Sequence, residues 1–139
     1  MPGFEPQTDV HITVVPIDSA LEATPIITEQ CLLACPDNEG LQMELLSVGY
    51  RANTLPIDST DLHVDIEFID DSNSDAVTDL AENFDMAAAT VLVYNEVYRG
   101  HQILDAGDVI NAEFTVTSPS TISAGAALIV EYRILRRSA

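Results

Sequence analysis

The sequence contains no lysine and no tryptophan, and its five basic residues are all arginines. Asp and Glu together number 23, so the formal net charge at pH 7 is -18. Nucleic-acid backbones and anionic lipid surfaces bind patches of excess positive charge, which this chain does not offer. We therefore expect neither a nucleic-acid partner nor attachment to a membrane.

Long apolar runs are missing as well, because no uninterrupted stretch approaches the roughly 18 apolar residues that a membrane span requires. The start shows no basic segment followed by an apolar one, so we expect no signal peptide and a soluble product made in the cytoplasm. Cys31 and Cys35 are the only cysteines. Their Cα atoms would lie too far apart on an extended strand for a disulfide, so we interpret both as free thiols in the core.

With 139 residues, 47% of them hydrophobic, the chain has the size and composition of one compact domain. Residues 1–8 contain Pro2, Gly3 and Pro6 around a single aromatic residue, Phe4. This composition is typical of an extended arm and not of a packed element. We expect this N-terminal arm to be followed by a single domain at residues 9–139.

Alternation of hydrophobic and polar residues is the main structural signal, and it predicts β-strands. The alternation is clearest at residues 62–68 and recurs at residues 10–14, 110–117 and 128–134, with turn-forming residues between the segments. Residues 41–55 differ, because hydrophobic residues occupy both alternating sets. They predict a central strand that is covered on both faces.

Two further segments complete the prediction. Residues 89–98 are rich in β-branched and aromatic residues, which favours another strand. In contrast, Val77, Leu80 and Phe84 lie near one face of a helix, so we expect a short helix at residues 76–84. About seven or eight strands separated by turns then predict an all-β fold, an antiparallel β-sandwich or jelly roll with this one helix.

The sequence offers no catalytic motif: histidines do not occur at metal-binding spacing, and no nucleophile elbow is present. We therefore expect a protein that is not an enzyme and that uses no cofactor. Five residues do match ligand positions of the EF-hand calcium loop, namely Asp71, Asn73, Asp75, Asp79 and Glu82. However, Ala76 stands where the sharp turn of that loop needs glycine, and a strand is expected before Asp71. Acidic residues that cap a short helix explain the same pattern, so no metal is assigned.

Four blocks of sequence carry a resemblance to a known family: residues 61–66 (DLHVDI), 79–84 (DLAENF), 104–110 (LDAGDVI) and 125–132 (GAALIVEY). Together with the length and the N-terminal arm, they resemble the small decoration, or cement, proteins on the capsids of tailed bacteriophages, especially those of cyanobacterial and marine phages. The resemblance implies a trimer of β-sandwiches that sits at local three-fold positions of the shell and clamps neighbouring major capsid subunits. It implies no catalytic residues.

Our sequence-based hypothesis is therefore a structural virion protein on the capsid exterior, a homotrimer that binds the major capsid protein. The doubly apolar segment at residues 41–55 suggests the trimer interface. An acidic protein needs apolar or arginine contacts to bind a shell, so the candidate contact residues are Phe4, Arg133, Arg136 and Arg137. The alternative hypothesis is a carbohydrate- or ligand-binding β-sandwich module, calcium-dependent through residues 71–82.

Overall fold

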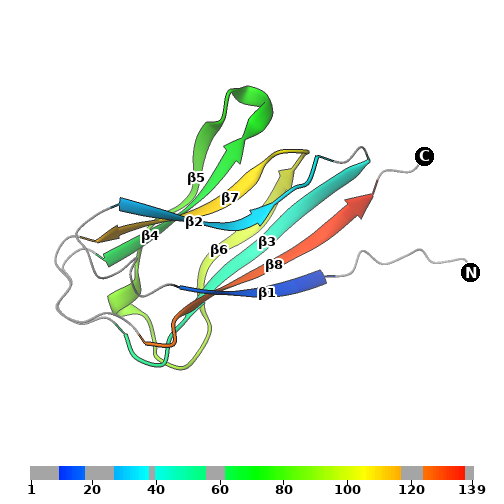
Figure 1. Cartoon of the computed structure of the whole chain (residues 1–139). Coiled ribbons are helices and arrows are strands. Elements are labelled where there is room, and N and C mark those ends of the chain that lie inside the picture. The colour runs from blue at the N-terminus through cyan, green and yellow to red at the C-terminus, as the bar shows by residue number, and fades with distance from the viewer. Residues whose placement is uncertain (1–9, 18–26, 38–39, 56–61, 117–123, 137–139) are drawn as a thin grey trace, which may run out of the picture.

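The computed structural model describes residues 10–17, 27–37, 40–55, 62–116 and 124–136, which form two four-stranded sheets packed face to face (Figure 1). One sheet has the order β1 (Val10–Pro16), β8 (Ala127–Arg136), β3 (Leu41–Arg51) and β6 (Asn95–Leu104). The other has the order β2 (Ile27–Ala34), β7 (Val109–Val116), β4 (Leu62–Asp70) and β5 (Ala76–Asp85). All six strand pairs are antiparallel. The predicted antiparallel β-sandwich is confirmed, and the strand order is that of a jelly roll.

The hydrophobic core lies between the two sheets and follows the alternation of the sequence. On β7, for example, Ile110, Ala112 and Phe114 are fully buried, while Asn111 and Glu113 between them face outward and are only half-buried. Burying a side chain such as Phe114 stabilises the fold by roughly 1.5–3 kcal/mol. The largest fully buried side chains include Tyr50, Leu45, Phe114 and Ile66 from the two sheets, and Met86 from the 3₁₀ turn at Met86–Ala88.

The prediction of a helix at residues 76–84 is wrong, because this segment is strand β5 and pairs with β4. Leu80 and Phe84 both pack against the core. Residues four positions apart lie on one face of a helix and on one face of a strand, so their spacing does not distinguish the two structures. Val77 distinguishes the two structures, since it is 55% exposed and lies opposite the outward-facing Ile69. The helical turns that do occur here are short 3₁₀ turns at Asp71–Asn73 and Met86–Ala88. No helix among the residues that the structure describes is long or apolar enough to cross a membrane.

The strand expected at residues 41–55 is central, between β8 and β6, and every residue from Leu45 to Tyr50 is buried, but its two apolar sets do not mark two apolar faces. Strand β3 ends at Arg51, and its register with both neighbouring strands shifts between Leu45 and Ser47. This irregularity at Leu46 reverses the alternation, so Met43 and Leu45 before it and Val48 after it all face the same core. The two apolar sets are thus one core-facing set, and β3 provides no second apolar surface for a trimer.

The turn at residues 105–108 connects β6 to β7 and is fixed by a buried carboxylate. Asp108 accepts hydrogen bonds from the backbone N–H groups of Asp105 (2.8 Å) and Asp71 (2.9 Å). Gly107 adopts a φ of 87°, a conformation that favours glycine. The thiol of Cys35 is buried near this turn, while Cys31 is exposed on β2, and both cysteines are free. The expectation of free thiols is therefore confirmed, but only one of them is buried.

Candidate functional site

Strand β1 presents its hydrophobic residues to the outside. Val10, Ile12 and Val14 are 46%, 66% and 59% exposed, whereas Val15, opposite the fully buried Leu128, packs against the core. The sequence pattern predicts this strand, but it also predicts that the apolar set faces the core, whereas in the structure that set faces outward. Strand β1 is also at the edge of its sheet. A hydrophobic edge strand that faces solvent marks a surface for contact with another protein chain.

The exposed hydrophobic surface continues from β1 across the sheet to Tyr94, in the loop before β6. A hollow of about 240 Å³ is lined by Ile12, Ser47, Tyr94, Arg99, Ile129 and Glu131. The ring of Tyr94 lies against the backbone of Gly49, where a Cβ atom would overlap it. We call the surface formed by Val10, Ile12, Val14, Tyr94 and Ile129 the apolar face. The hollow is smaller than the roughly 300–1,000 Å³ of typical small-molecule sites, so it suits a protruding side chain of a protein partner better.

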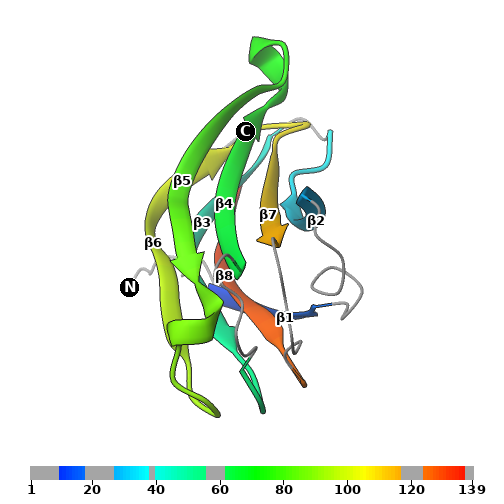
Figure 2. The same cartoon turned by 90° about the vertical axis from the view of Figure 1, so that its left-hand side faces the viewer.

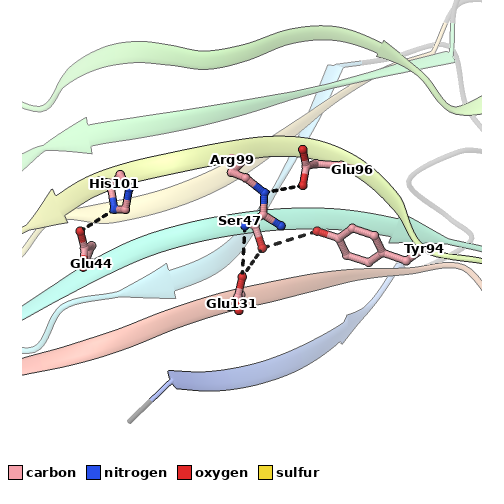
Figure 3. A network of polar contacts seen from close by, with 7 residues as sticks. All are labelled: Glu44, Ser47, Tyr94, Glu96, Arg99, His101 and Glu131. Carbon is pink, nitrogen blue, oxygen red and sulfur yellow. Dashed lines mark hydrogen bonds and ion pairs between the residues drawn. The ribbon is translucent and has the colours of Figure 1, made fainter. Parts of the chain in front are cut away.

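Next to the apolar face, charged side chains are paired with one another (Figure 3). Arg99 binds Glu96 through Nε at 2.7 Å and reaches Glu131 through Nη1 at 3.9 Å. The same carboxylate of Glu131 accepts a hydrogen bond of 2.9 Å from the hydroxyl of Ser47. The hydroxyl of Tyr94 lies 3.4 Å from Ser47 Oγ, which ties the loop to the sheet.

A second carboxylate, that of Glu44, lies between a histidine and an arginine. His101 Nδ1 is 3.0 Å from Glu44 Oε2, and Arg133 Nε is 3.5 Å from Glu44 Oε1. The arginines whose side chains are described, Arg51, Arg99 and Arg133, all belong to the β1-β8-β3-β6 sheet. This side of the molecule is therefore close to charge balance, although the chain as a whole carries -18.

The predicted contact residues are only partly placed by the structure. Arg133 lies on the outer face of β8 and is opposite Val10, so it borders the apolar face. Arg136 ends β8, but its side chain lies outside the described part of the structure, as do Phe4 and Arg137 altogether. The residues that sequence reasoning missed are those of β1 and Tyr94, because the orientation of an edge strand depends on its register with β8.

Among the described residues, the outer surface of the other sheet carries several acidic side chains and no arginine. We call it the carboxylate face and define it by Glu29, Asp65, Glu67, Asp79 and Glu113, which lie on the four strands that Figure 2 shows side by side. Register brings them together: Glu113 lies opposite Glu29 on one side and Asp65 on the other, and Glu67 lies opposite Asp79. Carboxylate oxygens of Glu29, Glu67 and Glu113 all lie within 4.8 Å of one another.

Burial and mutual repulsion raise the pKa values of two of these carboxyl groups. The pKa of Glu67 rises to about 7, first because the side chain is buried and then because Glu113 and Glu29 are negatively charged. The pKa of Glu113 also rises, through burial and then through Asp65 and Glu29. No local sequence signal identifies this cluster, because its members come from three strands that are far apart in the chain.

The five calcium candidates of the 71–82 segment do not form a loop around one point. Asp71 and Asn73 belong to a 3₁₀ turn, whereas Asp79 and Glu82 lie on the extended strand β5. Among the described Asp, Glu, His and Cys residues, the one group of three or more whose ligand atoms lie within 4.8 Å of one another consists of Glu29, Glu67 and Glu113. The segment therefore lacks the compact turn of an EF-hand loop.

Comparisons with known proteins identify no relative, since no protein-family model and no curated protein sequence matches the chain.

Proposed function

We propose that this protein is a structural component of a tailed-phage virion, a decoration protein that binds the outside of the capsid as a homotrimer. The observation that carries the proposal is the apolar face on β1, where three hydrophobic side chains of an edge strand face solvent. Such a surface is costly for a free monomer and suits a protein whose role is assembly. The jelly-roll order of the strands agrees with the sandwich that the family resemblance implies.

Self-association through the apolar face agrees with the distribution of charge. Copies with a net charge of -18 repel one another, so a stable interface must bury hydrophobic surface where acidic charge is low. The apolar face meets this condition, because Arg99 and Arg133 balance Glu131 and Glu44 beside it. The carboxylate face does not, since pairing two copies there would bring acidic clusters together.

Attachment to the shell then falls to residues near the two termini. In sequence, the N-terminal arm with Phe4 precedes β1, while Arg136 is the last residue of β8 and Arg137 follows it. A stretch of eight residues reaches at most about 29 Å, far enough to cross onto a neighbouring capsid subunit. Apolar and arginine contacts at these ends would allow an acidic trimer to bind the major capsid protein.

A capsid-binding assay tests this account. We would measure the occupancy of undecorated capsids by the full-length chain, by a variant without residues 1–8, by Arg136→Ala/Arg137→Ala, and by Arg51→Ala as an arginine control. We expect the first two variants to lose occupancy and Arg51→Ala to retain it. Because a trimer binds through three copies at once, losing one contact from every copy lowers the affinity for the capsid by about 100-fold or more. Equal occupancy by all four proteins would refute this mode of attachment.

A further inference from the structure

Three polar or charged side chains are buried in the described part of the structure: Ser47, Glu67 and Asp108. Ser47 donates to Glu131, and Asp108 accepts two backbone hydrogen bonds. Glu67 is only 7% exposed, yet none of the described residues donates a hydrogen bond to its carboxylate or forms an ion pair with it. A buried carboxylate ordinarily has a hydrogen-bonding or cationic partner. Glu67 therefore has neither a hydrogen-bond donor nor a cationic partner among the described residues.

The position of Glu67 shows where such a partner would bind. Its carboxylate lies against those of Glu29 and Glu113, with oxygens within 4.8 Å of one another. Two oxygens that bind one calcium ion at about 2.4 Å lie at most about 4.8 Å apart, so these three can bind a common ion. Glu67 is buried, Glu113 is half-buried and Glu29 is exposed, which leaves the cluster accessible from the side of Glu29.

No protein cation competes for this position among the described residues. Arg51, Arg99 and Arg133 belong to the other sheet, and the sequence contains no lysine. The neighbouring amide of Asn111 donates to Glu29 Oε1 at 3.3 Å, which leaves Glu67 without a donor. Asp65 and Asp79 add negative charge beside the cluster. A cation from solvent is the partner that this chemistry selects.

We propose that Glu29, Glu67 and Glu113 bind one calcium ion, which links strands β2, β4 and β7 on the carboxylate face. Calcium suits the site better than magnesium, because calcium tolerates irregular carboxylate geometry and more than six oxygen ligands. Water molecules complete the coordination. The site is distinct from the 71–82 segment and independent of the apolar face. Calcium binding stabilises the fold, since the ion binds the assembled sheet and not the unfolded chain.

The test is isothermal titration calorimetry of the full-length, calcium-free protein with calcium chloride at constant neutral pH. We expect one ion per chain, with a dissociation constant of about 10⁻⁵ to 10⁻³ M. Glu67→Gln and Glu113→Gln are isosteric and remove one ligand charge each, so each should weaken binding by about tenfold or more. Glu82→Gln removes an equal charge from the same sheet but outside the cluster, and it should bind calcium as the wild type does.

Three outcomes would overturn the proposal. The first is the absence of calcium binding by the wild-type protein. The second is equal weakening by Glu67→Gln and Glu82→Gln, which would indicate a diffuse response to charge. The third is loss of binding in Glu82→Gln alone, which would move the site to the 71–82 segment. Circular dichroism of each variant confirms that it is folded, so that lost binding reports on the site itself.

Discussion

Beside the apolar face the charged groups pair with groups of opposite sign and the exposed surface is hydrocarbon, whereas on the carboxylate face the described acidic groups have no basic partner. Arg99 and Arg133 are paired with glutamates beside the exposed valines of β1. On the other sheet, four acidic residues surround Glu67, and none of its described neighbours is basic. The apolar face is therefore suited to contact with another protein surface, and the carboxylate face to binding a cation.

The largest effect that we expect on stability comes from the carboxylate face. Glu67 has a pKa of about 7 in the folded protein and 4.5 as the ordinary value, so the folded state binds more protons between these limits. Its contribution to stability is fully present below pH 4.5 and is lost as the pH rises through about 7. In calcium-free buffer, we expect Glu67→Gln to be more stable than the wild type by roughly 3 kcal/mol at about pH 8 and nearly equal to it at about pH 4.

Urea unfolding at a series of pH values, with EDTA present, measures this difference. The groups that face Glu67 are Glu29 on β2, Glu113 and Asn111 on β7, and Asp65 and Asp79, and none of them is basic. Glu82→Gln is the control, because the exposed Glu82 lies outside the cluster. A pH-independent difference between Glu67→Gln and the wild type would contradict the repulsion that we assign to the carboxylate face.

A smaller effect is expected where Tyr94 covers Gly49 on the apolar face. Alanine ordinarily stabilises a strand relative to glycine, but a Cβ atom at position 49 would overlap the Tyr94 ring. We expect Gly49→Ala to destabilise the protein by about 1–2 kcal/mol in urea unfolding. In a Tyr94→Ala background the same substitution should lose most of this effect. An equal effect in both backgrounds would show that Tyr94 does not pack against the sheet in solution.

Most of the fold follows from the sequence, because alternation identifies strands such as β4, β7 and β8 and turn residues separate them. The errors arise where alternation is ambiguous or interrupted. Leu80 and Phe84 fit a helix as well as a strand, and only pairing with β4 decides between them. The shift of register at Leu46 makes one core-facing set look like two faces.

The candidate surfaces were harder to predict from the sequence than the fold. Glu29, Glu67 and Glu113 meet only through the register of β2, β7 and β4, which no local pattern encodes. The EF-hand match at residues 71–82 reflects the acidic composition of the segment, since its residues form a 3₁₀ turn and a strand and not a binding loop. Strand β1 was identified, but its outward orientation depends on which residues of β8 it pairs with.

The central claim, that the apolar face is an interface between copies, is tested most directly by the molecular mass in solution. Light scattering should give the wild type three times the chain mass of 15.0 kDa. Val14→Asp and Val77→Asp form a matched pair, since these valines are 59% and 55% exposed on the edge strands β1 and β5. We expect Val14→Asp to be monomeric and Val77→Asp to remain trimeric. A monomeric wild type, or a trimer that survives Val14→Asp, would contradict the account.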